Sequence, residues 1–428
     1  MKKFCSRFLM VCAGIVVLGG IGIAAYLQHP LFGALPSGEC LERIARSPNH
    51  ADGAFHNQID TPMRTTEQPE WSMWLETIFG EKGQPRPPGT IPAIKTDLGA
   101  LDPAQDLVIW LGHSSYFVQL AGQRILIDPV FSSNAAPVPR VNLAFEGTSL
   151  YTAQDMPKID VLLVTHDHYD HLDYPSILAL QAKVRRVVVG LGVGAHFEAW
   201  GYDMDIVREV DWFDVVEPTP GLQIHVTPAR HFSGRTLTRN RSLWVGFALV
   251  SPERRLFFSG DSGYAPHFVE IGRRLGPFDW VALDMGQYDP RWANVHMNPE
   301  QAAQAAEDLR AKVLTPAHAG RFSISPHDWD DPFKRITVAS QGRSYALWTP
   351  EIGRPIHLDG RAQAFRAWWE EAASFRLQAS SQAPPHSSPP GFPPSRSPRF
   401  RRGSCCRCRG RPAHADAAGS PPSRRSAR

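Results

Sequence analysis

Four potential metal ligands fall within six residues of this chain, in the run His-Asp-His-Tyr-Asp-His. They are His166, His168, Asp170 and His171, and the apolar residues 161–165 directly before them predict a strand that delivers them into a loop. Imidazole suits zinc, iron or manganese, and a carboxylate adds negative charge for a second ion. The spacing therefore favours ligands divided between two metal ions. A histidine-rich surface turn is the alternative, and further ligands downstream disfavour it.

These further ligands are His231, Asp261 and His318, and each of them follows an apolar, strand-like segment. Taken singly, each histidine would more often be an ordinary surface or core residue, and the aspartate a turn residue. Residues at strand ends can gather along one edge of a layered sheet and form one cleft. Seven ligands with one bridging carboxylate would complete a dinuclear site.

The elements that must position these residues are indicated by short apolar runs separated by turns. Strands are predicted at residues 107–112, 116–120, 124–128, 161–165, 184–190, 223–227, 243–250, 256–259, 280–283 and 312–315. Helices are predicted at about 175–182, 266–275 and 299–310, the last with Asn298 as its cap, Pro299 at its first position and Gln301 three residues after the cap. Many strands with a few helices between them predict a two-sheet α/β layered domain over residues 106–375.

The N-terminus predicts a membrane segment, because Lys2, Lys3 and Arg7 precede residues 8–27, which carry no charge. A helix of that length spans roughly 30 Å, a full bilayer crossing. An uncleaved anchor is favoured over a signal peptide, whose apolar region is normally shorter, although small residues at 22, 24 and 25 leave cleavage open. The positive flank predicts that the rest of the chain lies on the periplasmic or extracytoplasmic side.

Proline-rich residues 28–105 are expected to form an extended lead-in, and residues 376–428 a disordered Ser/Pro/Arg-rich tail. Residues 381–428 hold ten arginines against one acid, a charge of +9, so the rest of the chain carries −6. An acidic body argues against nucleic acid as a partner, since phosphate neutralisation drives such binding. The tail is either a polybasic extension that touches anionic lipid or a segment without function. No cysteine lies between residues 41 and 404, which excludes a disulfide framework and a thiolate ligand in the body.

Seven motifs give the chain a family resemblance over about residues 30–375. They are residues 110–115 (WLGHSS), 127–132 (IDPVFS), 165–171 (THDHYDH), 228–235 (PARHFSGR), 259–263 (SGDSG), 288–292 (YDPRW) and 296–300 (HMNPE). With these motifs the sequence resembles the metallo-β-lactamase superfamily, in the branch that contains the N-acylphosphatidylethanolamine-hydrolysing phospholipase D and its bacterial relatives. The chain departs from the family's final motif, since Ala319 follows His318 where a tryptophan is expected. That departure leaves the ligands intact and concerns the shape of one pocket wall.

The resemblance implies a four-layer αββα sandwich, preceded here by one transmembrane helix. It also implies two divalent ions, with zinc first and manganese or iron as alternatives. The implied ligands are His166, His168 and His231 for one ion, Asp170, His171 and His318 for the other, and Asp261 as the bridge. Asp128 would match the first family motif and support a ligand without binding metal.

Two adjacent cations can activate a water and neutralise oxyanion charge, so the expected reaction is hydrolysis. Asp170 is expected to orient the nucleophile. His296, just before a helix N-terminus that favours anions, is expected to bind substrate or donate a proton, with a structural strand-to-helix connection as the alternative. His113 and Arg235 are weaker candidates for substrate binding, with a local backbone or salt-bridge role as the alternative.

The favoured function is a phosphodiesterase of the phospholipase D type that acts on N-acylphosphatidylethanolamine-like phospholipids. The enzyme alternative is a lactonase or other carboxylic-ester hydrolase of the same fold, and the non-enzyme alternative is a membrane-tethered metal-binding protein. A true β-lactamase is disfavoured because its commonest type needs a thiolate ligand. The expected partners are a phospholipid or other small-molecule substrate, the membrane and a second copy in a homodimer.

Overall fold

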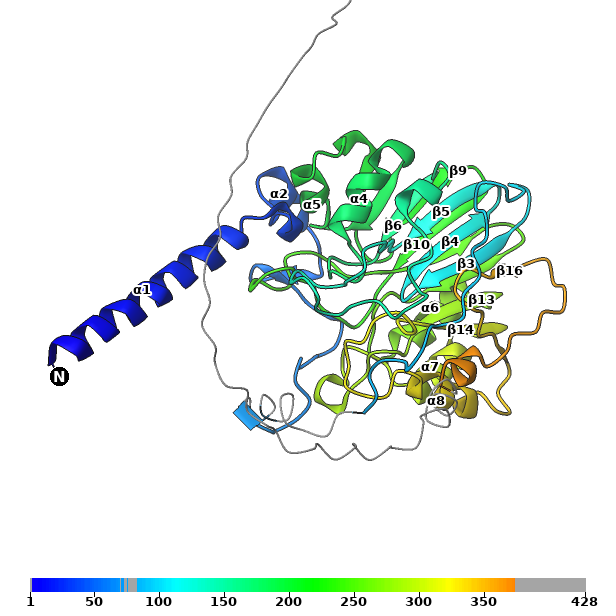
Figure 1. Ribbon diagram of the computed structural model, residues 1–428. Coiled ribbons are helices and arrows are strands. Elements are labelled where there is room, and N and C mark those ends of the chain that lie inside the picture. Colours follow the sequence, from blue (N-terminus) through cyan, green and yellow to red (C-terminus); the bar gives the residue numbers. More distant parts are fainter. Residues whose placement is uncertain (1, 70, 73–74, 76–82, 374–428) are drawn as a thin grey trace, which may run out of the picture. The chain divides into compact units, whose positions relative to one another are not determined.

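The computed structural model describes residues 2–69, 71–72, 75 and 83–373 (Figure 1). Its body is built from two β-sheets, each of which contains seven strands within the described residues. The first sheet has the order β16 (Pro355–His357), β3 (Leu107–Gly112), β4 (Ser115–Leu120), β5 (Gln123–Ile127), β6 (Val161–Val164), β7 (Val187–Gly190) and β8 (Val207–Val210). The second has the order β15 (Ala346–Leu347), β14 (Val313–Ala317), β13 (Trp280–Asp284), β12 (Arg255–Phe258), β11 (Gly246–Val250), β10 (Leu222–Thr227) and β9 (Val215–Thr219).

Each sheet is antiparallel in one half and parallel in the other. Strands β16 to β5 pair antiparallel, whereas β5 to β8 pair parallel. In the second sheet, β9 to β12 pair antiparallel and β12 to β15 pair parallel. Strands β3, β4, β6, β7 and β13 are buried along their whole length, which is why they appear in the sequence as apolar runs without alternation.

Helices cover the outer faces of both sheets and complete four layers (Figure 1). On the first sheet, α4 (Tyr174–Leu180) and α5 (Gly194–Ala199) share an apolar core with β6 and β7. On the second sheet lie α6 (His267–Leu275), α7 (Pro299–Asp308) and α8 (Asp331–Ala339), whose apolar side chains join the core that also fills the space between the sheets. The αββα sandwich is therefore confirmed, with Asn298 capping α7 as predicted.

Several elements differ from the sequence-based prediction. The strands expected at 184–190 and 243–250 begin three residues later, and β8, β9, β15 and β16 were not predicted. Helices α5 and α8 were also missed. These elements are short or lie at sheet edges, where half-exposed side chains give a weak pattern. The predicted tail after residue 375 lies outside the described residues.

The N-terminal part begins with α1 (Lys2–Tyr26), which contains a stretch long and apolar enough to cross a membrane, at Arg7–Tyr26. Residues 28–105 then contain short elements that the sequence did not indicate: η1 (Pro30–Phe32), α2 (Glu39–Ile44) and a small hairpin of β1 (His50–Ala51) and β2 (Ala54–Phe55). Their buried side chains, among them Ile44 and Phe55, join the core between the sheets. The described part of this lead-in is therefore packed on the body.

Candidate metal centre

The seven predicted ligands come together at one edge of the sandwich. His166, His168, Asp170 and His171 occupy the loop between β6 and α4, while three other loops follow strands of the second sheet. Those loops carry His231 after β10, Asp261 after β12 and His318 after β14. Six of the seven are buried, and His168 is half-buried.

Four ligand atoms of the first group, from His166, His168, His231 and Asp261, lie within 4.8 Å of one another. His168 Nδ1 is 2.9 Å from His166 Nε2 and 3.2 Å from His231 Nε2. The Asp261 Oδ2 atom lies 3.7 Å from both Nε2 atoms. The three imidazoles thus surround one point, with one carboxylate beside it.

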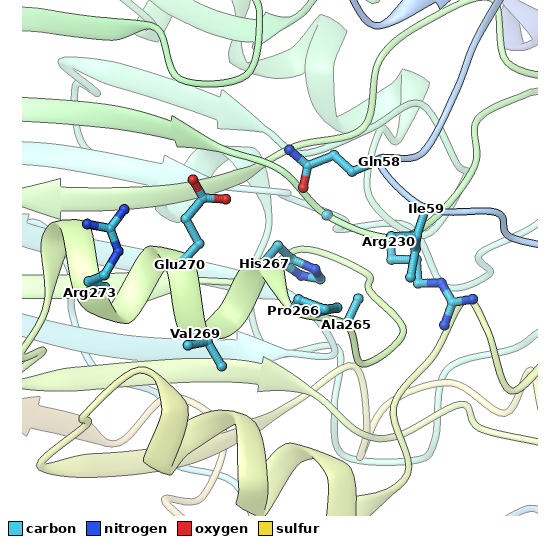
Figure 2. Close-up of a pocket in the computed structure, with 10 residues that line it drawn as sticks. Gln58, Ile59, Arg230, Ala265, Pro266, His267, Val269, Glu270 and Arg273 are labelled. Atoms are coloured by element: carbon cyan, nitrogen blue, oxygen red, sulfur yellow. The ribbon is translucent and has the colours of Figure 1, made fainter.

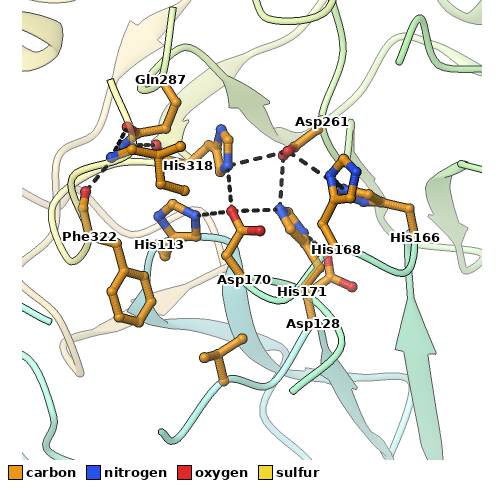
Figure 3. Close-up of polar contacts among 12 residues, drawn as sticks. His113, Asp128, His166, His168, Asp170, His171, Asp261, Gln287, His318 and Phe322 are labelled. Atoms are coloured by element: carbon orange, nitrogen blue, oxygen red, sulfur yellow. Dashed lines mark hydrogen bonds and ion pairs between the residues drawn. The ribbon is translucent and has the colours of Figure 1, made fainter. Parts of the chain in front are cut away.

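A second group adjoins the first and contains Asp170, His171 and His318, joined by His113 (Figure 3). Its ligand atoms also lie within 4.8 Å of one another. Asp261 contacts this group too, since its Oδ1 is 3.1 Å from His171 Nε2 and its Oδ2 is 3.2 Å from His318 Nε2. Asp261 is therefore the one carboxylate of the seven residues placed between both groups.

The donors in this cluster fit divalent cations. His171 Nε2 and Asp261 Oδ1 are buried and have no hydrogen-bond partner among the described residues, although they lie close together. Such groups are costly to bury unless something satisfies them. Imidazole nitrogens and carboxylate oxygens that face a shared space can be satisfied by zinc, manganese or iron. The buried histidines and aspartates can therefore bind metal.

The charge state of the cluster favours the same conclusion. Burial and the neighbouring histidines hold the pKa of His166 well below its usual value, so this imidazole is neutral and can offer a lone pair. Burial alone would raise the pKa of Asp261, but the charges of His171 and His318 outweigh it and keep that pKa far below normal. Burial would likewise lower the pKa of His318, yet Asp261 and Asp284 raise it to about 10. These carboxylates attract positive charge at the place where a cation would lie.

Hydrogen bonds behind the cluster fix the tautomers of its histidines. Asp128 accepts hydrogen bonds from Thr165 N (2.8 Å), Thr165 Oγ1 (2.6 Å) and His171 Nδ1 (2.8 Å), which leaves His171 Nε2 free to face the cluster. His231 Nδ1 lies 2.9 Å from the carbonyl oxygen of Val295 and donates to it. The structure thus places Asp128 directly behind His171.

Asp284 is a site residue that sequence reasoning missed. It ends β13, is fully buried, and lies 3.1 Å from His318 Nδ1 and 2.8 Å from His296 Nδ1. The His296 ring stacks on His318 at a centroid distance of 5.0 Å and lies 5.0 Å from His231. The only signal in the sequence was its place at the end of an apolar run, which resembles the apolar segments that precede Asp261 and His318.

His113 and Arg235 are both buried and bonded to neighbouring protein groups. His113 has no exposed surface, and its Nε2 is 2.9 Å from Asp170 Oδ2. The buried Arg235 guanidinium donates to the carbonyl oxygens of Leu31 (2.7 Å), Asp167 (2.8 Å) and Leu172 (2.7 Å). The geometry therefore favours the alternative of local support for both residues over the expected contact with substrate.

A cavity of about 470 Å³ lies beside α6, outside the metal cluster (Figure 2). Its lining combines apolar side chains, including Ile59 and Val269, with Arg230 and Glu270. None of the seven cluster residues lines it, although Arg230 directly precedes His231. The chemistry of the donor set therefore identifies the site better than the size of this cavity does.

Comparisons with known proteins support the interpretation of this cluster as a metal centre. A model of the beta-lactamase superfamily domain matches residues 123–319. An uncharacterized protein of Mycobacterium tuberculosis is 35% identical over 328 residues, 76% of this chain and 88% of that protein. A UPF0173 metal-dependent hydrolase of Caldivirga maquilingensis is 30% identical over 240 residues, 56% of this chain and 93% of that protein.

The name of a further relative states its substrate. The N-acyl-phosphatidylethanolamine-hydrolyzing phospholipase D 1 of Caenorhabditis elegans is 31% identical over 237 residues, 51% of this chain and 65% of that protein. The seven residues of the buried His/Asp cluster all lie within residues 123–319, which the family model matches. The chain accordingly belongs to the metallo-β-lactamase superfamily and is a metal-dependent hydrolase of that fold.

Proposed function

We propose that this chain is a dinuclear phosphodiesterase that hydrolyses N-acylphosphatidylethanolamine-like phospholipids in the manner of a phospholipase D. One observation carries the dinuclear part: Asp261 lies 3.1–3.7 Å from histidines of both ligand groups, as a bridging carboxylate must. The name of the nematode relative and the apolar helix α1 support a lipid substrate.

His166, His168 and His231 would hold one ion, and Asp170, His171 and His318 the other, with Asp261 between them. When bound, such a pair of divalent ions, zinc first with manganese or iron as alternatives, supplies a nucleophile from water at neutral pH and neutralises charge on the reacting phosphate. The chain's own groups must then orient that water and provide a proton for the departing oxygen.

Asp170 is placed to orient the attacking water. His113 Nε2 donates to Asp170 Oδ2 over 2.9 Å, which holds the carboxylate in one rotamer. The carboxylate is ionised, because the surrounding histidines keep its pKa well below normal despite its burial. A fixed, charged acceptor directs one water hydrogen away from the substrate and a lone pair toward phosphorus.

His296 is placed to donate the proton that the leaving group needs. Its Nδ1 is bonded to Asp284, which leaves Nε2 as the nitrogen available to substrate, and its side chain is 11% exposed. As the new oxygen–phosphorus bond forms, the bond to the N-acylethanolamine oxygen breaks, and His296 Nε2–H protonates that oxygen. The bond to Asp284 holds the imidazole ring in place for this transfer.

The cellular setting belongs to the same proposal. Helix α1 would anchor the chain in a membrane, with the positive residues Lys2, Lys3 and Arg7 on the cytoplasmic side and the hydrolase domain, residues 106–375, on the periplasmic or extracytoplasmic side. A homodimer remains part of the proposal, to be tested by the mass of the solubilised protein.

The test is metal analysis combined with substrate assays on the full chain. We expect about two transition-metal ions per chain, and hydrolysis of both N-acylphosphatidylethanolamine and bis(p-nitrophenyl) phosphate. Asp261→Ala should lose activity and metal, whereas Asp205→Ala, at an exposed position, should match the wild type. Unchanged activity in Asp261→Ala would contradict the dinuclear mechanism. Turnover of lactones or carboxylic esters without phosphodiesterase activity would show that the substrates are carbonyl compounds and not phosphodiesters.

A further inference from the structure

Residues at the end of α1 and just after it form hydrogen bonds with Pro137 and Arg235, which lie in loops of the body. Tyr26, the last residue of α1, donates from its hydroxyl to the carbonyl oxygen of Pro137 over 2.5 Å. Five residues later, the Leu31 carbonyl accepts from Arg235 Nη2, and the Arg235 Nη1 atom donates to the carbonyl oxygens of Asp167 and Leu172. Asp167 lies within the ligand loop, residues 166–171, and Leu172 directly follows it.

Aromatic ring contacts also connect the end of α1 to the ligand loop, residues 166–171. The Tyr26 ring meets Phe32 edge-on at 5.5 Å, and Phe32 meets Tyr169 edge-on at 6.4 Å. Tyr169 lies in sequence between the ligands His168 and Asp170. Five residues span at most about 18 Å. The metal-site loops therefore lie close to the end of α1, where tyrosine commonly marks the level of the lipid headgroups.

The loops that these contacts join carry exposed apolar side chains. In residues 133–143, Val138 is 50% and Val141 is 44% exposed, and in residues 236–241, Leu237 is 95% exposed. Leu35, just after η1, is 51% exposed. Large apolar side chains with this exposure on loops beside a membrane helix are typical of groups that enter a bilayer interface.

The charge on these two loops differs from that of the body. Residues 133–143 contain Arg140 and no acidic residue, and residues 236–241 contain Arg239 and Arg241 and no acidic residue. All three arginines are exposed. The first 380 residues carry −6 overall, so a cationic and apolar combination here is complementary to the phosphates and acyl chains of a lipid surface.

We propose that Leu35, residues 133–143 and residues 236–241 form a docking surface that seats the metal site on the same bilayer that holds α1. This inference rests on the proposed membrane anchor and narrows the substrate to a lipid that reaches the site from the bilayer. The docking surface places the metal-site loops at headgroup level, so the phosphodiester of a lipid enters without leaving the membrane.

The first test measures depth in the membrane. The full chain, with its six cysteines replaced by serine, receives a single fluorescent label at Val17→Cys, Val138→Cys, Leu237→Cys or Val338→Cys and is reconstituted into vesicles with nitroxide-labelled acyl chains. We expect strong quenching at 17, clear quenching at 138 and 237, and none at 338, which is 65% exposed on α8.

The label at position 17 distinguishes a failure of the docking surface from a failure of the membrane anchor. Quenching at 17 together with solvent-like signals at 138 and 237 would overturn the docking surface and leave the anchor intact. No quenching at 17 would overturn the anchor and the docking surface with it. Both outcomes are independent of enzyme activity, so failure of the proposed reaction does not affect the result.

The second test compares two substrates. The double variant Val138→Asp/Leu237→Asp should hydrolyse the lipid in vesicles on the order of tenfold more slowly, because charged groups oppose insertion. Its rate on soluble bis(p-nitrophenyl) phosphate should stay unchanged, and Val338→Asp should match the wild type on both. An equal loss on both substrates, or no loss on the lipid, would overturn the inference.

Discussion

His296, which is partly exposed, and Asp284, which is buried, form a hydrogen-bonded pair at the rim of the metal cluster. Leaving-group chemistry can test this pair. His296→Gln should lower kcat for N-acylphosphatidylethanolamine by roughly 10²–10⁴-fold, because its alkoxide leaving group needs a proton. The rate on bis(p-nitrophenyl) phosphate should fall far less, since p-nitrophenolate leaves without one. Steady-state rates on both substrates check this, with His56→Gln, at an exposed position, as control. Equal losses on both substrates would assign His296 to binding instead.

Asp128 supports the metal cluster through its hydrogen bond with His171, and a measurement of metal affinity should reveal this role. Asp128→Asn can no longer accept the His171 Nδ1–H as a carboxylate does, so the imidazole loses its fixed tautomer. We expect metal affinity to fall about 10- to 100-fold, which is typical for the loss of such a partner. Competition with a chromophoric chelator measures this without any substrate. Asp205→Asn is the matched control, and an unchanged affinity would show that Asp128 supports only the loop backbone.

At the scale of elements, the sequence was most informative where a buried strand ends in a ligand. The apolar run of β6 and the six residues after it could be recognised together, and the capping of α7 by Asn298 is confirmed. The contacts that support the ligands from distant positions could not be found in this way. His113 lies at φ 55° in the tight turn between β3 and β4, and its contact with Asp170 joins residues 57 positions apart. Only the packed fold creates such a contact.

The cap of α7 offers a prediction at this scale. The Asn298 side chain accepts from Gln301 N over 2.9 Å, and the Gln301 side chain accepts from Asn298 N over 3.1 Å. Asn298→Ala removes the first bond and should lower the free energy of unfolding by about 1 kcal/mol. Asn298→Asp keeps an acceptor and should lose little. Urea denaturation measures both, and equal losses in the two variants would show that the cap bond does not stabilise the helix.

At the scale of the whole molecule, the cluster joins the two sheets. Residues 166–171 follow β6 of the first sheet, whereas His231, Asp261 and His318 follow strands of the second. Bound metal would therefore connect loops whose separation exposes the space between the sheets. Removal of metal by a chelator should lower the melting temperature, since a ligand at a thousand times its Kd stabilises the folded state by about 4 kcal/mol per site. Asp261→Ala should show a much smaller shift in a scanning fluorimetry experiment, because it lacks the bridging ligand. An equal shift in both proteins would mean that the chelator acts elsewhere and that the sheets do not depend on the cluster.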